Sequence, residues 1–158
     1  MKRYASRPFP RYRHLPGTTP HPERSPEGHL YGVQEPPAHP LTEDGWAQNE
    51  DFLFGVDLFN AGYFWEAHTF WERLWALEEA SPEIRRFLQA IIQTAAACLK
   101  IRQGQVAGAR RLLDRAGLDS LDGRKHGVDL HALAADARRF VEGGEEPPHL
   151  VLLTSDER

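Results

Sequence analysis

The side chains with the clearest potential for chemistry lie in one aromatic segment, residues 60–75, which contains Glu66, His68 and Glu72. Residues four apart on a helix face the same way, so His68 and Glu72 can touch, whereas Glu66 points about 200° away from His68 around the axis. A histidine beside a carboxylate can be a general base held by an orienting group, or one of two metal ligands. This spacing makes His68 and Glu72 the first candidates for a functional site.

A second polar row is predicted on the next helix, where three polar residues recur every four positions in an otherwise apolar segment. Residues at this spacing share one helix face, which meets the first candidates if the two helices are neighbours. The combined candidate cluster is Glu66, His68, Glu72, Arg85, Gln89 and Gln93.

We consider two roles for this cluster. In the first, its members satisfy one another inside the protein, with Arg85 paired to a glutamate and the glutamines bonded to histidine and backbone. A buried polar group without a partner costs about 1 to 3 kcal/mol, which favours such networks. In the second, the cluster lines a pocket in which His68 is a general base or metal ligand, Glu72 orients it, and Arg85 binds an anion.

Known catalytic motifs do not extend the second interpretation. The metal-binding HExxH pattern is broken, because Thr69 and Glu72 stand where it requires a glutamate and a second histidine. No P-loop, dinucleotide-binding glycine pattern or GxSxG elbow occurs. We therefore predict no metal and no cofactor, and assign no catalytic residue.

Helical spacing of apolar residues predicts an all-α fold, a compact bundle of about five helices built from antiparallel hairpins. Thr42 is the expected N-cap of the first helix, Ser81 with Pro82 begins the third, and Gly117 ends the fourth. A polar loop is expected over residues 119–127. The expected helices cover residues 42–59, 63–78, 82–102, 106–116 and 129–142.

Proline content divides the 158-residue chain, because nine of its 12 prolines fall in residues 1–41. We expect residues 1–41 to form an extended arm that packs on a helical domain, residues 42–143, followed by a tail, residues 144–158. The arm carries a net charge of +3 and the remainder −7, from a total of −4. Within the tail, the apolar run 149–154 can dock as an extended segment, and its conformation is left open.

Several classes of protein find no support in the sequence. The arm histidines, at spacings of 7, 8 and 10 residues, match no metal-ligand pattern, and an acidic body gives no support for nucleic-acid binding. No apolar run is long enough to cross a membrane, and no signal peptide follows Met1, so we expect a cytoplasmic protein. The one cysteine, Cys98, is flanked by Ala97 and Leu99 and is expected to be a buried thiol.

The segment from Phe59 to His68, with Trp71-Glu72, Phe87-Leu88-Gln89 and Ile92-Gln93, resembles the signature of the DUF309 family. The resemblance covers roughly residues 50–117. It implies a small all-helical protein and implies no activity, because the family has unknown function. Thr69 stands where the family signature has a glutamate, so a site that needs three carboxylates on this helix is incomplete here.

Two functional hypotheses follow. The first is a non-enzymatic interaction or scaffold domain whose aromatic groove, including Trp65, Trp71 and Trp75, receives a protein, a peptide or a second copy of the chain. The second is a small enzyme or metal- or ligand-binding protein with a pocket around His68, Glu72 and Arg85. Core packing is the alternative role for the three tryptophans.

Overall fold

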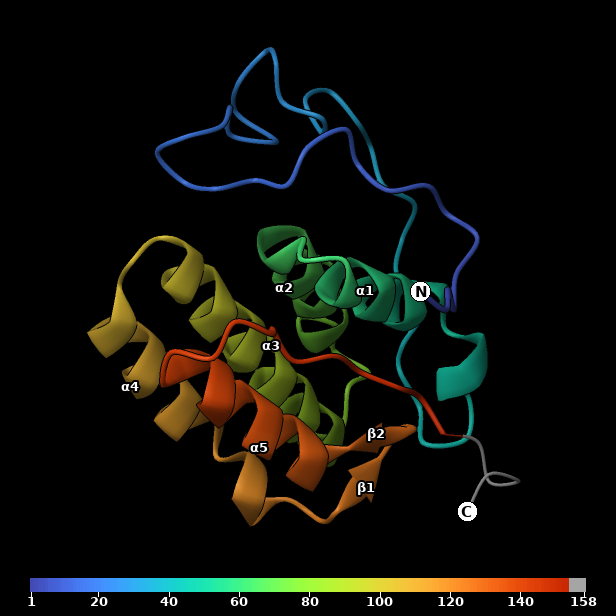
Figure 1. Ribbon diagram of the computed structural model, residues 1–158. Helices are drawn as coiled ribbons and strands as arrows, with labels where there is room; N and C mark the ends of the chain where they lie inside the picture. The colour runs from blue at the N-terminus through green and yellow to red at the C-terminus, as the bar shows by residue number, and fades with distance from the viewer. Residues whose placement is uncertain (154–158) are drawn as a thin grey trace.

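The computed structural model describes residues 1–153 and shows five helices that pack against one another (Figure 1). This arrangement confirms the predicted all-α bundle. Helix α3 lies against α2, α4 and α5, while α1 packs on α2. The helices are α1 (Glu50–Asn60), α2 (Phe64–Trp75), α3 (Pro82–Arg102), α4 (Val106–Ala116) and α5 (Leu130–Val141).

The first helix begins later than predicted. Asn49, not Thr42, is the N-cap of α1, and its side chain accepts the backbone N–H of Phe52. The Thr42 hydroxyl instead accepts the N–H of Gly45, which closes a turn before the short 3-10 helix η1 (Trp46–Gln48). Because that turn uses the Thr42 oxygen locally, no α-helix starts there. The predicted starts of α3 and α4 are confirmed, and Ser81 caps α3.

The glycine in the middle of α1 is explained by close packing between α1 and α2. A Cβ atom on Gly55 would lie 2.1 Å from Nε1 of Trp71, so only glycine fits here. The same indole nitrogen donates to the backbone oxygen of Phe52 at 3.2 Å. Trp71 therefore lies in the core, together with Phe52, Phe59, Phe64, Phe87 and Leu88.

The predicted polar loop 119–127 is partly wrong. It begins in a second 3-10 helix, η2 (Leu118–Ser120), and then enters an antiparallel hairpin of β1 (Arg124–Lys125) and β2 (Val128–Asp129). The two turn residues, His126 and Gly127, both have positive φ, the geometry of a tight hairpin turn. The prediction failed because histidine is not a usual residue for this position.

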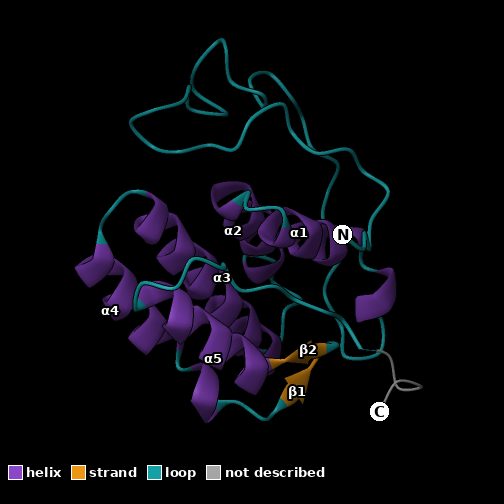
Figure 2. Cartoon of the chain, viewed as in Figure 1, coloured by secondary structure: helices purple, strands orange, loops and turns teal. Residues whose placement is uncertain are grey.

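The arm, residues 1–41, contains no helix or strand and crosses above α1 and α2 (Figures 1 and 2). The chain from the end of α5 to Leu153 also contains no helix or strand. Asn60 exchanges two hydrogen bonds with the backbone of Leu150, and Leu152 donates its N–H to the hydroxyl of Tyr4. The tail thus docks on α1 and on the arm, while Thr154, the last residue of the predicted apolar run, lies outside the described residues.

Two further sequence predictions concern single features. Cys98 is fully buried, and burial raises the pKa of its thiol to about 12, so the expected buried thiol is confirmed. None of the helices within residues 1–153 combines the length and the apolar character that crossing a membrane requires.

Candidate functional site

The face formed by α1 and α2 contains two buried carboxylates, and each binds the arm. The first is Asp57 in the middle of α1, whose side chain is fully buried. Its two oxygens accept the backbone N–H groups of Tyr4 and Ala5 at 2.8 and 2.9 Å and the Nε–H of Arg3 at 2.9 Å. Asp57 therefore holds the beginning of the arm mainly by accepting backbone N–H groups of the arm.

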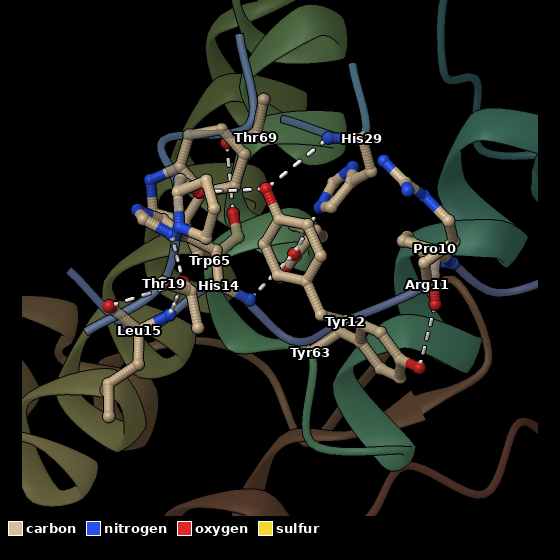
Figure 3. A network of polar contacts seen from close by, with 12 residues as sticks. Pro10, Arg11, Tyr12, His14, Leu15, Thr19, His29, Tyr63, Trp65 and Thr69 are labelled. Carbon is tan, nitrogen blue, oxygen red and sulfur yellow. Dashed lines mark hydrogen bonds and ion pairs between the residues drawn. The ribbon is translucent and has the colours of Figure 1, made fainter. Parts of the chain in front are cut away.

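The second carboxylate is Glu66 in the first turn of α2, which is only 1% exposed. One of its oxygens, Oε2, accepts the backbone N–H of His14 at 2.9 Å and contacts Nε2 of His29 at 2.8 Å. Figure 3 shows His14 and His29 converging from two parts of the arm on this side of α2. Oε1 of Glu66 has no hydrogen-bond partner within the described residues. Glu66 thus joins two arm segments that are 15 residues apart.

Aromatic side chains cover α2 around Glu66. The rings of His14 and His21 both pack edge-on against Trp65, with centroid distances of 5.1 and 5.6 Å. The Tyr12 hydroxyl donates to the backbone oxygen of Pro20 and accepts the N–H of His29 (Figure 3). These contacts fold the arm into a compact layer over one turn of α2.

Arginines supply a third kind of contact between the arm and this face. Arg7 lies 5.1 and 4.9 Å from the rings of Phe54 and Phe70, which belong to α1 and α2. Its guanidinium also pairs with Glu35, and this hydrogen bond lowers the pKa of the Glu35 carboxyl. Arg7 therefore ties two arm segments together above the aromatic seam between α1 and α2.

The electrostatic environment favours a neutral His14. Burial lowers the pKa of its imidazole, and the neighbouring His21 and His29 lower it further. Its Nδ1 lies 2.8 Å from the hydroxyl of Thr19, which fixes the ring against Trp65. Protonation of His14 is consequently unfavourable while the arm is docked.

The helices beneath this layer of the arm match a known protein family. Residues 52–112 match the family model of DUF309, a domain of unknown function. The match confirms the resemblance drawn from the sequence. Comparison with curated proteins and with solved structures gave no significant match. Asp57 and Glu66 both lie inside the DUF309 region, whereas the arm precedes it.

The DUF309 region does not assemble the predicted polar cluster as one group. His68 and Glu72 lie on the same face, but Nε2 and Oε1 are 3.9 Å apart and Glu72 is exposed. Arg85 donates to the backbone oxygens of Trp75 and Leu77, so the predicted pairing of Arg85 with a glutamate is wrong. The carbonyl groups that follow α2 attract this guanidinium, because the end of a helix leaves them without intrahelical donors.

The two glutamines also differ in position. Gln89 is exposed on α3, while Gln93 is partly buried and its Oε1 has no partner within residues 1–153. Thr69, which replaces the glutamate of the family signature, donates to the backbone oxygen of Trp65 one turn earlier. Among the side chains of described residues, no group of three or more His, Cys, Asp or Glu is placed to bind a metal ion.

The three tryptophans occupy three different environments. Trp71 is fully buried in the core, Trp65 is partly covered by arm histidines, and Trp75 is 42% exposed. A single aromatic groove lined by all three is therefore absent from the described structure. The aromatic side chains that contact the arm include Phe54, Tyr63, Trp65 and Phe70.

Sequence reasoning missed the residues that hold the arm. Asp57 stands in the otherwise apolar run 52–59, and a lone carboxylate in such a run is a signal for a buried partner. The excess of arginine and histidine in the arm was the complementary signal. Linking the two required knowledge of contacts more than 50 residues apart, which spacing alone does not provide.

Proposed function

We propose that this protein is an interaction domain whose α1–α2 face binds a proline-rich, basic segment without helix or strand, and that its own arm is the resident occupant. The observation that carries the proposal is the pair of buried carboxylates, Asp57 and Glu66, which accept three backbone N–H groups of the arm. A carboxylate that accepts backbone donors recognises an extended chain with little dependence on its side chains.

Side-chain contacts add selectivity to this backbone recognition. Arginine over the Phe54 and Phe70 rings favours a basic segment, since a cation is attracted to the face of an aromatic ring. The excess charge of −7 outside the arm favours a basic partner over an acidic one. Proline suits this face because the bound arm forms turns and irregular chain, without helix or strand, and the carboxylates need only a few of its N–H groups.

A segment that covers this face must donate to the two carboxylates. A buried carboxylate that loses its donors costs several kcal/mol unless water reaches it. A competing segment therefore displaces the arm only if it brings equivalent donors to Asp57 and Glu66. This condition defines the partner by chemistry: a basic segment with free backbone N–H groups and an aromatic or histidine side chain for Trp65.

The test cuts the arm from the domain without removing it. A protease recognition sequence is inserted at Gly32, within residues 31–34, which are all exposed. After cleavage, a labelled synthetic peptide of residues 1–32 is titrated, and its exchange with the bound arm is followed by fluorescence anisotropy. We expect the cut arm to stay bound and the labelled peptide to replace it, with affinity about tenfold weaker in the Glu66→Gln variant, or about 1.4 kcal/mol.

A scrambled peptide of the same composition is the matched control. Equal binding of the scrambled and native peptides would show that charge alone attracts the arm. Collapse of the helical domain when the cut arm is removed would show that the arm is a permanent part of the core. Either result overturns the interaction proposal.

A further inference from the structure

A second region with unusual polar groups lies at the β1–β2 turn, which makes no hydrogen bond to Asp57 or Glu66. Two cavities, of about 610 and 870 Å3, meet at this turn and share Glu43, Lys125 and His126 in their walls. Volumes in this range are typical of sites for small molecules. The smaller cavity reaches the start of α3, and the larger one lies against Trp46 and the hairpin.

His126, at this corner, has an unfavourable backbone conformation and an unpaired ring nitrogen. It has a φ of 50°, in the left-handed region that residues other than glycine seldom adopt. It is 9% exposed, its ring packs 4.5 Å from the centroid of Phe87, and its Nδ1 has no hydrogen-bond partner within residues 1–153. Asparagine would suit this turn better, so the position of the imidazole ring in the cavity wall needs another explanation.

The charges around the smaller cavity are unbalanced. Its walls carry four carboxylates and two cations. Lys125 lies 3.8 Å from one carboxylate, Asp122, and the Arg86 guanidinium is bound to the backbone oxygens of Ala116 and Gly117 and to the hydroxyl of Ser120.

Of the three remaining carboxylates, Glu83 lies in the first turn of α3, where the helix dipole stabilises a negative charge. Glu43 and Glu79 have no ion-pair partner in the described part of the chain. Both are exposed residues that line the cavity, and neither has a counter-charge there.

We propose that this corner binds a small organic amine, a protonated alkylamine or diamine, between the His126 ring and the carboxylates of Glu43 and Glu79. An ammonium group donates hydrogen bonds to carboxylates and to an unprotonated imidazole nitrogen, and its alkyl chain suits the apolar part of the cavity that Phe87 and Ile84 form. Burial, aided by Lys125, lowers the pKa of His126 to about 4, so the ring is neutral and can accept such a bond at neutral pH.

The test is a titration of the full-length protein with 1,4-diaminobutane, followed by calorimetry and by the imidazole resonances in NMR. We expect saturable binding that shifts the His126 resonance. The double variant Glu43→Gln/Glu79→Gln should bind at least tenfold more weakly, because it removes both unpaired charges. His126→Asn should also weaken binding several-fold while keeping the turn, since asparagine tolerates the left-handed conformation.

The matched control is Glu78→Gln, because Glu78 is exposed next to Glu79 but does not line the cavity. This variant should bind the diamine as tightly as the wild type. Sodium chloride at equal ionic strength should not shift the His126 resonance. Absence of saturable binding, equal affinity in the double variant, or preferential binding of inorganic phosphate at this corner would overturn the proposal. Leu41 is the one arm residue in the wall of either cavity, and it makes no hydrogen bond to Asp57 or Glu66, so failure here leaves the arm proposal intact.

Discussion

On the α1–α2 face, the buried carboxylates of Asp57 and Glu66 accept donors from the arm, although Oε1 of Glu66 has no partner within residues 1–153. At the β1–β2 turn, a buried histidine lacks a partner for Nδ1, and two exposed carboxylates of the cavity wall lack counter-charges, in the described part of the chain. The first region has an occupant, which is part of the same chain. The second has the cavity and the unmatched groups of a site whose ligand is a separate molecule. The two regions differ because the arm supplies backbone donors to Asp57 and Glu66, whereas no segment of residues 1–153 supplies a partner to Nδ1 of His126.

The largest effect on stability is expected at Asp57, because on the α1–α2 face this one side chain accepts the most hydrogen bonds from the arm. Asp57→Ala should lower the free energy of unfolding by about 2 to 4 kcal/mol, because it leaves two backbone N–H groups and part of the Arg3 charge without an acceptor. Arg3 is one-third exposed, which limits the contribution of its charge. Denaturant unfolding measures the change, and Glu50→Gln, at an exposed position of the same helix, should change stability by less than about 0.5 kcal/mol.

The next largest effect is expected from acid, which should destabilise the protein at the β1–β2 turn through His126. The pKa of His126 in the folded protein is about 4, below the ordinary value of 6.5, so the unfolded chain binds more protons below pH 6.5. The free energy of unfolding therefore keeps its full value above pH 6.5. It falls by about 2 to 3 kcal/mol as the pH falls towards 4. His14, whose pKa is also lowered, acts in the same direction. Unfolding measured at several pH values should show this loss, and His126→Asn should reduce it; an unchanged pH dependence in that variant would contradict the assignment.

A smaller effect is expected at the second anchor. Glu66→Gln should lower the free energy of unfolding by about 1 to 3 kcal/mol. The neutral amide oxygen accepts the His14 N–H less strongly, and the carboxylate charge beside His29 is lost. Limited proteolysis should then cut the arm faster than in wild type, while the helices keep their protection. Equal cutting rates in the two proteins would show that Glu66 does not hold the arm.

The smallest effect on stability is expected at His68 and Glu72, the pair that the sequence makes the first candidates for a functional site. Glu72→Gln should change stability by less than about 0.5 kcal/mol, because Glu72 is exposed and its separation from His68 is 3.9 Å. A loss above about 1 kcal/mol in thermal or denaturant unfolding would indicate that His68 and Glu72 belong to a structural network after all.

Local patterns predicted the helices well because each depends on neighbours within a few residues. The Ser81 cap with Pro82 and the Gly117 end define α3 and α4, and both boundaries follow from chemistry within one turn. The same kind of reasoning failed at Thr42, where a competing local bond to Gly45 removed the capping oxygen.

The candidate site was predicted poorly because its residues meet only in the folded chain. Helix spacing predicts that Glu66 and His68 point in different directions, but it could not reveal that the arm binds Glu66. Asp57 and Glu66 find donors 52 to 54 residues earlier in the sequence. Likewise, nothing in the sequence around His126 indicates that its ring packs against Phe87, on a different element.

The central claim is that Asp57 and Glu66 hold the arm through its backbone, and amide hydrogen exchange of Tyr4, Ala5 and His14 tests it most directly. The wild-type protein should protect these three amides, although none of them lies in a helix or strand. In Glu66→Gln, the His14 amide should lose protection while Tyr4 and Ala5 keep it. Exchange of all three wild-type amides at the rate of exposed residues, or equal loss of protection at all three in Glu66→Gln, would contradict the claim.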